Sequence, residues 1–221
     1  MSSNILIVGG TSGLGLSLAS LFAAQACKVY VTGRKNPNME GLHFIELELD
    51  TDSLAVALDN VLFEMPYFDL VVYSAGFYQE ARIGELSDGD IMKMERVGLL
   101  APVMLMSRLI RRQKFVPTFI AVTSTSQWTP RKLEPVYCAT KAGLGMFAHV
   151  LSLDESVGKI LVIGVAGMGT PFWKAENRDI STMLDPEWVA EKIIEELQGY
   201  YAYKLIKVLR TPARVEIAEI E

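Results

Sequence analysis

The feature of this chain that most restricts its fold is a run of apolar residues leading straight into a glycine-rich turn. Residues 5–8 read Ile-Leu-Ile-Val, the pattern of a strand buried on both faces. Glycines follow at positions 9, 10, 13 and 15, and apolar residues then recur at helical spacing over 16–26. A strand, a glycine turn and a helix in this order direct free backbone N–H groups and the positive end of a helix dipole toward one point. The stretch therefore predicts a phosphate-binding loop.

Three glycines of this turn have separate expected roles. Gly9 permits the tight turn, Gly13 leaves room for the backbone to approach a pyrophosphate, and Gly15 lets helix and strand pack closely. The spacing G-x-x-x-G-x-G differs from the common G-x-G-x-x-G, and glycines also mark ordinary turns. We expect the loop to bind a dinucleotide cofactor. Its expected cofactor-binding residues are Gly9, Thr11, Ser12, Gly13, Leu14 and Gly15.

Strand-like and helix-like segments alternate along the rest of the chain. We expect strands at 28–32, 43–49, 69–73, 118–123, 159–165 and 204–209, and helices at 51–63, 88–113, 135–156 and 186–197. This alternation, without a repeat or a linker, predicts a Rossmann-like doubly wound parallel sheet of about seven strands. Right-handed crossovers place helices on both faces. Residues 1–221 are expected to form a single α/β domain.

Composition excludes several other classes of protein. The formal net charge of −5 disfavours a nucleic-acid partner. The longest apolar run, 97–106, is too short to span a bilayer, and the start of the chain lacks the charged region of a signal peptide. Cys27 and Cys138 have no pairing or metal-ligand spacing, and His43 and His149 are isolated, so no metal site is expected. These features predict a cytoplasmic protein.

Cofactor preference depends on the end of the second expected strand. Dinucleotide-binding folds usually place an acid there, which holds the hydroxyls of the adenosine ribose. Here Gly33 leaves space, and the planar, permanently charged guanidinium of Arg34 suits a 2′-phosphate. The alternative is an ordinary surface arginine. We expect NADP(H) as the preferred cofactor, with NAD(H) as the alternative. Asp50, after the third strand, either contacts adenine or caps a helix.

A second group of residues, Ser124, Tyr137 and Lys141, carries acid–base chemistry. Tyr137 and Lys141 stand four residues apart on an expected helix, so their side chains share a face. An ammonium near a phenol favours the phenolate, so Lys141 is expected to lower the pKa of Tyr137. Ser124 ends the fifth strand, at the sheet edge where such folds bind ligands. A Tyr–Lys pair at this spacing is by itself usually a surface pair.

In this order, the motifs make the chain resemble the single-domain short-chain dehydrogenase/reductase family along nearly its whole length. GGTSGLG at 9–15 matches T-G-x-x-x-G-x-G after Val8, and YCATK at 137–141 matches Y-x-x-x-K. The resemblance implies that Tyr137 donates a proton, that Lys141 binds the nicotinamide ribose and tunes Tyr137, and that Ser124 orients a carbonyl. It also implies cofactor contacts from Asp50, Ser74, Ala75, Gly76 and Thr170.

Several positions depart from the family pattern. Gly98 stands where the family has an Asn that holds a water linking the lysine to solvent. Tyr73 and Ser74 replace paired Asn residues, and Ala166 replaces a Pro ahead of Thr170. We therefore predict a working but slow reductase, in which Gly98→Asn changes turnover.

Aromatic residues on loops at the same sheet edge predict an apolar or ring-containing carbonyl substrate, with simple loop packing as the alternative. Residues 172–184 are expected to form a substrate lid, with Met183 among its apolar contacts. The expected substrate contacts are Phe77, Gln127, Trp128, Phe172 and Trp173.

Two expected helices, 88–113 and 135–156, carry more apolar residues than a solvated helix needs. The resemblance implies that such proteins pair through these helices, so a homodimer or homotetramer is expected.

Two functions from different classes fit these observations. The leading one is an NADP(H)-dependent carbonyl reductase or alcohol dehydrogenase, because a pure binding protein has no need of the Ser–Tyr–Lys arrangement. The alternative is a non-catalytic or weakly active NADP(H)-binding sensor, which Gly98 and the changes at 73–74 favour. An epimerase or dehydratase would need an additional substrate domain.

Overall fold

The computed structural model describes residues 3–173 and 179–221. Its centre is one eight-stranded sheet in the order β3-β2-β1-β4-β5-β6-β7-β8. Strands β1 to β7 run parallel, and β8 pairs antiparallel with β7. The order reverses between β1 and β4, which confirms the doubly wound topology. The strands are β1 (Asn4–Val8), β2 (Lys28–Gly33), β3 (Leu42–Glu46), β4 (Leu70–Tyr73), β5 (Val116–Ser124), β6 (Val157–Val165), β7 (Tyr203–Arg210) and β8 (Ala213–Ile220).

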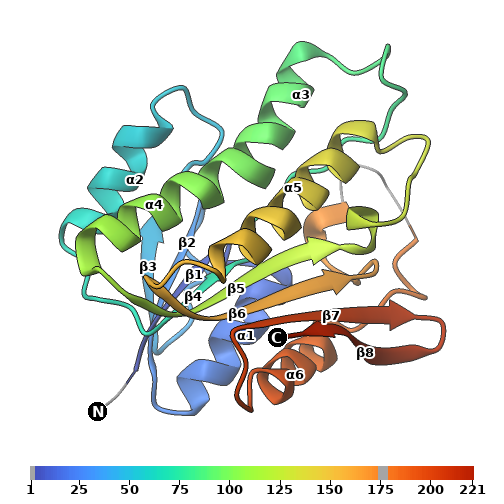
Figure 1. The fold of residues 1–221 in the computed structure, drawn as a ribbon. Helices are drawn as coiled ribbons and strands as arrows, with labels where there is room; N and C mark the ends of the chain where they lie inside the picture. The colour runs from blue at the N-terminus through green and yellow to red at the C-terminus, as the bar shows by residue number, and fades with distance from the viewer. Residues whose placement is uncertain (1–2, 174–178) are drawn as a thin grey trace.

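Helices cover both faces of this sheet (Figure 1). On one face lie α1 (Gly13–Ala24) and α6 (Pro186–Glu196), and on the other lie α2 (Leu54–Phe63), α4 (Ala101–Gln113) and α5 (Pro135–Leu151). Side chains alternate across β1: Ile5 and Ile7 join the core under α1 and α6, whereas Leu6 and Val8 join the core under the other three helices. The period-two alternation explains why the first strand reads as one continuous apolar run.

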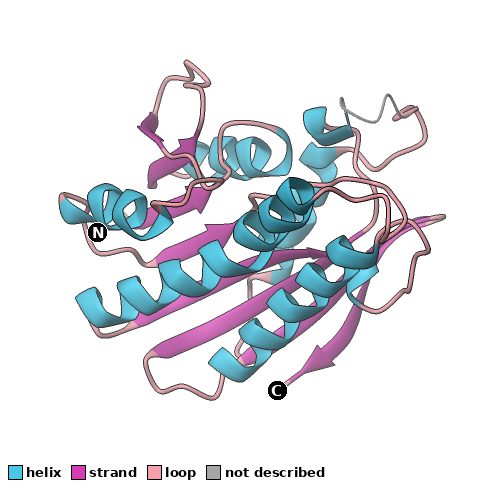
Figure 2. Ribbon diagram, turned by 90° about the horizontal axis from the view of Figure 1, so that it is seen from above, coloured by secondary structure: helices cyan, strands magenta, loops and turns pink. Residues whose placement is uncertain are grey.

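The long helix expected at 88–113 is present, but it is not uniform. It consists of α3 (Asp88–Glu95), a π-helical turn (Arg96–Leu100) and α4. Seen from above, α4 and α5 lie side by side across the strands (Figure 2). A π-helical turn inside a helix is rare and often lies at a functional site. Gly98 stands at the middle of this turn, which places a departure from the family pattern at the one irregular point of the helix.

Two details of the sheet differ from the expectation. Strand β8 was not expected, because its residues are mostly exposed and carry no sustained apolar pattern. It covers the outer edge of β7, and its charged side chains suit an edge strand. Strand β3 ends at Glu46, whereas 43–49 was expected, although Leu47 and Leu49 beyond it are buried. No helix among the described residues is both long and apolar enough to cross a membrane.

Candidate active site

A cavity of about 890 Å³ lies at the carboxyl ends of the parallel strands. Loops that follow β1, β4, β5 and β6 line it, where doubly wound sheets bind their ligands. Most of the expected site residues line this one cavity. They are Gly9, Thr11, Ser12, Gly13, Leu14, Arg34, Ser74, Ala75, Gly76, Thr170, Ser124, Tyr137, Lys141, Phe77, Trp128, Phe172, Trp173 and Met183.

The glycine turn has the geometry of a phosphate cradle. Gly9 and Gly13 adopt φ of +81° and +52°, which side chains rarely permit. A Cβ at Gly9 would lie 2.6 Å from the backbone nitrogen of Ala75, and one at Gly15 only 2.2 Å from the carbonyl oxygen of Gly9. Gly15 is therefore a packing position, and it does not line the cavity. Ser12 makes no side-chain capping bond to α1, so it leaves the first amides of the helix available to an anion.

Arg34 lines the same cavity at the end of β2. Its side chain is exposed and makes no ion pair or hydrogen bond with any residue that the structure describes. A Cβ at Gly33 would lie 2.2 Å from Oγ1 of Thr11, so Gly33 keeps β2 close to the phosphate-binding loop. These residues fit a cofactor that carries a 2′-phosphate, because a free guanidinium borders the open end of the cradle.

Asp50 does not lie where an adenine contact was expected. Its carboxylate is 3.6 Å from Nζ of Lys93 and 3.5 Å from a guanidinium nitrogen of Arg96, and it is not among the described residues that line the cavity. The acid that lines the cavity here is Glu48, beside buried Leu49. The alternation of Leu47, Glu48 and Leu49 could have indicated this, because a half-buried segment exposes every second residue.

Ser124, Tyr137 and Lys141 converge from two elements. Ser124 ends β5, and the other two lie one turn apart at the start of α5. The hydroxyls of Ser124 and Tyr137 are hydrogen-bonded. Tyr137 is 8% exposed and Lys141 is 4% exposed, and Nζ of Lys141 donates to the carbonyl oxygen of Val122 at 3.1 Å. The arrangement places a serine hydroxyl, a phenol and an ammonium at one point of the cavity, suited to proton transfer.

The pKa of Tyr137 is raised in the structure, whereas the sequence predicted that Lys141 would lower it. Burial raises the pKa of Tyr137, the hydrogen bond from Ser124 opposes this rise, and the charge of Glu134 adds to it. Nζ of Lys141 lies 5.7 Å from the centre of the tyrosine ring and bonds to a carbonyl of β5, so it does not overcome the desolvation of the phenol. Burial also lowers the pKa of Lys141 to about 8. Desolvation is therefore the main influence on the pKa of both groups.

Sequence reasoning missed Glu134, which fixes the turn after Ser124. Its buried carboxylate accepts hydrogen bonds from Oγ of Ser126 at 2.7 Å and from the hydroxyl of Tyr78 at 3.2 Å. Ser126 in turn contacts Ser124: its backbone N–H donates to Oγ of Ser124 at 3.2 Å. No local motif marks Glu134, because one of its two partners, Tyr78, lies 56 residues away in the sequence.

Aromatic side chains form a wall beside Tyr137. The ring of Tyr78 lies 5.0 Å from that of Tyr137 and 5.2 Å from that of Trp173, and Phe172 contacts Trp173 at 5.1 Å. Nε1 of Trp173 donates to the carbonyl oxygen of Met168 at 2.8 Å, which holds the indole in place. The wall suits an apolar substrate and limits the access of water.

The structure corrects one expected substrate contact and describes only part of the expected lid. Gln127 does not line the cavity: its side chain packs on Gly145 of α5, where an added Cβ would lie 2.3 Å from its amide nitrogen. Its Oε1 is buried and has no hydrogen-bond partner among the described residues. Of the expected lid, residues 174–178 lie outside the described residues.

The departures at positions 73 and 98 fit together in space. The hydroxyl of fully buried Tyr73 donates to the carbonyl oxygen of Val97 at 2.5 Å, which gives a carbonyl of the π-helical turn a partner. A Cβ at Gly98 would lie 3.0 Å from Cβ and Oγ1 of Thr140. Thr140 is itself fixed, because its Oγ1 donates to the carbonyl oxygen of Tyr137 at 2.9 Å. The structure therefore leaves little room for an Asn at position 98.

We expect Gly98→Ala to destabilise the protein by about 1 kcal/mol, because crowding against Thr140 outweighs the better helix propensity of alanine. Urea unfolding measures the change. Gly89→Ala is the matched control: Gly89 lies in α3 with only Oγ of Ser87 nearby, at 3.7 Å, and its replacement should stabilise by about 0.5–1 kcal/mol. An equal gain in the free energy of unfolding from both replacements would show that a Cβ at position 98 is not crowded by Thr140.

Comparison with known proteins agrees with this geometry. The family model described as short chain dehydrogenase matches residues 3–180. The 3-oxoacyl-acyl-carrier-protein reductase MabA of Mycobacterium avium is 26% identical over 160 residues, 71% of this chain and 62% of that protein. Sorbitol-6-phosphate 2-dehydrogenase of Klebsiella pneumoniae is 24% identical over 99% of this chain and 88% of its own. The matches span 62% and 64% of the first two curated relatives, slightly under two thirds.

Solved structures show the same fold. A short-chain dehydrogenase/reductase from Vibrio parahaemolyticus superposes with a TM-score of 0.80 at 24% identity, covering 95% of this chain and 98% of its own. A short-chain dehydrogenase from Sphingobium yanoikuyae in complex with NADPH superposes with a TM-score of 0.78 at 17% identity, covering 88% and 84%. The match of the family model, over the fold described above, shows that this chain belongs to the short chain dehydrogenase family.

Proposed function

We propose that this protein is an NADP(H)-dependent reductase of a small, largely apolar carbonyl compound, and an alcohol dehydrogenase in the reverse direction. One observation carries the proposal: a single cavity joins the glycine cradle and Arg34 to Ser124, Tyr137 and Lys141. The complex of a structural neighbour with NADPH supports this cofactor class.

The chemistry divides among the residues of the cavity. When bound, the cofactor supplies a hydride for the carbonyl carbon. Ser124 donates a hydrogen bond to the carbonyl oxygen, and Tyr137 transfers its phenolic proton to the same oxygen. The ammonium of Lys141 stabilises the phenolate that remains, and the aromatic wall at Tyr78 and Trp173 keeps water from the reacting atoms.

Arg34→Ala tests the cofactor assignment. We expect it to weaken NADPH binding tenfold or more and to change NADH binding less than twofold, because only NADPH carries the 2′-phosphate. Fluorescence titration of both nucleotides measures this. Lys35→Ala is the matched control, because Lys35 is also exposed but does not line the cavity. Equal weakening of both nucleotides by Arg34→Ala would contradict the assignment. Tight NADPH binding without turnover of any carbonyl compound would favour a sensor.

We also propose a homo-oligomer that forms through α4 and α5, with the π-helical turn. The two helices lie side by side (Figure 2), and large apolar side chains are exposed on α5 and on the π-helical turn that leads into α4: Met146 is 63% exposed, Val150 58% and Leu100 46%. We expect light scattering to show a dimer or tetramer at micromolar concentration, and Met146→Glu to shift it toward the monomer. A monomeric wild-type protein would contradict this.

A further inference from the structure

Positive charge is concentrated in the cavity far beyond what the composition predicts. The chain as a whole has 26 acidic and 21 basic residues. Among the described residues that line the cavity, six are basic and two are acidic. Arg34, Lys93 and Lys141 lie toward the cofactor cradle and the reacting centre. The remaining three, Arg131, Arg210 and Arg214, have no place in the mechanism above.

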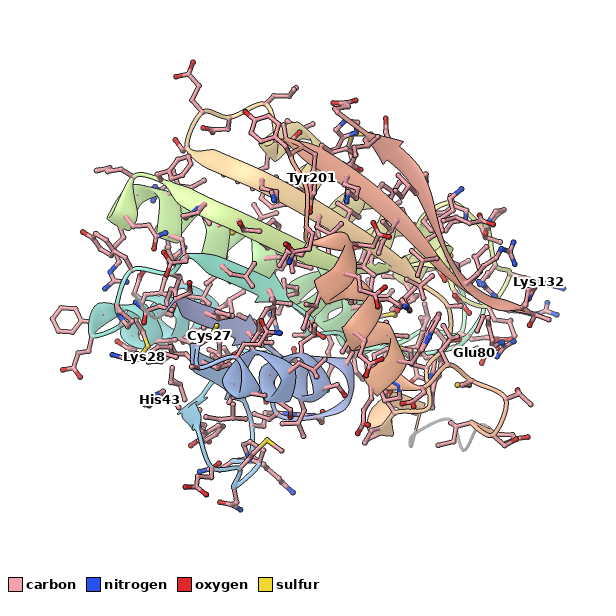
Figure 3. The ribbon with its side chains drawn as sticks, turned by 90° about the horizontal axis from the view of Figure 1, so that it is seen from below. Cys27, Lys28, His43, Glu80, Lys132 and Tyr201 are labelled. Atoms are coloured by element: carbon pink, nitrogen blue, oxygen red, sulfur yellow. The ribbon has the colours of Figure 1, made fainter. Side chains whose placement is uncertain are left out.

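These three arginines line the cavity from the loop before α5 and from the β7–β8 hairpin. Arg131 lies on the loop between β5 and α5, while Arg210 ends β7 and Arg214 is the second residue of the return strand β8. Figure 3 shows Lys132, which follows Arg131, on the same side of the molecule as the turn between β7 and β8. Trp128 joins the two elements: its ring lies over Gly164 of β6, and Nζ of Lys207 of β7 lies 4.8 Å from the ring centroid.

Neighbouring acids satisfy part of this charge but leave an excess. Nε of Arg131 lies 3.6 Å from Glu134, and Nε of Arg214 donates to Glu216 at 2.7 Å. Arg210 makes no ion pair or hydrogen bond with any residue in the part of the chain that the structure describes. A guanidinium that is free while its neighbours are held by acids is available to a ligand.

The cofactor's phosphates are too distant to be this ligand. The phosphate cradle follows β1, and Arg210 ends β7; in the sheet order these strands are four positions apart. At about 4.8 Å per strand spacing, this is roughly 19 Å. The reacting centre at the end of β5 lies between them, so the arginines are on the substrate side of the cavity.

We propose that the substrate carries an oxyanion, a carboxylate or a phosphate, which Arg210 binds where it lines the cavity at the end of β7. This inference rests on the proposed reductase function and narrows its substrate class. In this arrangement the carbonyl lies at Tyr137, the apolar middle of the molecule lies along Trp128 and Phe172, and the oxyanion reaches Arg210. The guanidinium fork matches the paired oxygens of either group.

Matched substrate pairs test the proposal. 4-Acetylbenzoate is compared with its methyl ester, and dihydroxyacetone phosphate with dihydroxyacetone, each with saturating NADPH. We expect wild-type kcat/KM to be at least tenfold higher for the charged member of one pair, and that pair identifies the oxyanion. Arg210→Ala should lower kcat/KM for the charged compound tenfold or more, mainly through KM, and change the neutral compound less than twofold.

A charge-matched control separates local binding from the general field of the protein. Lys28→Ala removes one positive charge at the start of β2, and Figure 3 places Lys28 on the opposite side of the molecule from Lys132. It should leave both members of each pair unchanged. Titration calorimetry of 4-acetylbenzoate and dihydroxyacetone phosphate against the NADP⁺-loaded protein, with wild type and Arg210→Ala, supplies a second readout that needs no turnover.

Two different failures can be distinguished. The oxyanion subsite would be overturned if the wild type reduced neutral and charged compounds with equal kcat/KM. It would also be overturned if Arg210→Ala lowered kcat/KM equally for both. Either result would leave the reductase function standing. Failure to reduce any carbonyl compound, with NADPH bound, would overturn the proposed function, and the oxyanion subsite of a substrate would fall with it.

Discussion

Tyr137→Phe is expected to lower the rate of carbonyl reduction by about 10²–10⁴-fold, the range for loss of a general acid. In the proposed mechanism the phenol donates the proton to the carbonyl oxygen, and phenylalanine keeps the ring packing against Tyr78. NADPH binding should change less than twofold, because the glycine cradle and Arg34 are untouched. Oxidation of NADPH at 340 nm measures the rate, and fluorescence titration measures binding.

Tyr30→Phe is the control for this replacement. Tyr30 stacks on His43 in the β2–β3 pair and does not line the cavity, so loss of its hydroxyl should leave turnover unchanged. A Tyr137→Phe variant that keeps more than a tenth of the wild-type rate would show that another group donates the proton.

Lys141→Met is expected to abolish measurable turnover and yet to stabilise the cofactor-free protein by about 1–2 kcal/mol at pH 7. Burial lowers the pKa of Lys141 from 10.5 to about 8, so the folded state holds the ammonium at a cost of about 3 kcal/mol. Methionine fills a similar volume without charge. The gain is smaller than that cost because the carbonyl oxygen of Val122 loses its hydrogen-bond donor.

The pH dependence of stability supplies an independent check. Between pH 8 and 10.5 the unfolded chain binds more protons at Lys141 than the folded chain, so wild-type stability rises with pH across this window. The part of this increase in stability that comes from Lys141 should be absent in Lys141→Met. Urea unfolding at pH 7 and pH 10 measures both effects. A variant that is less stable than wild type at pH 7, with the same pH dependence, would contradict a buried, destabilised ammonium.

The sequence predicted those strands and helices whose own residues show a clear apolar or glycine pattern. Residues 4–15 fix a strand, a turn and a helix through burial and glycine geometry alone, and the structure contains all three. Strand β8 has no such signal: its side chains are mostly exposed, and pairing with β7 alone defines it. The ion pairs of Asp50 could not be predicted locally, because Lys93 and Arg96 lie far along the chain.

In the candidate site too, features set by local spacing were predicted, and features set by contacts between distant segments were not. Spacing on one helix predicted that Tyr137 and Lys141 share a face. The hydrogen bonds of Glu134 depend on Tyr78 and Ser126, and the place of Arg210 in the cavity lining depends on where β7 ends relative to the other strands. Tyr73 and Gly98 read as two unrelated departures in the sequence, whereas in the fold Tyr73 bonds to Val97 beside Gly98. Contacts across the sheet decide these features.

Hydride transfer from the nicotinamide to a carbonyl carbon is the central claim, and isotope labelling tests it most directly. Wild-type protein is incubated with the carbonyl panel and NADPH deuterated at each face of C4 in turn, and the alcohol product is analysed by mass spectrometry and NMR. We predict that deuterium from one face appears on the carbinol carbon, and that the yield falls with the rate in Tyr137→Phe. NADPH that binds tightly but never delivers its deuterium to any carbonyl compound would contradict the account.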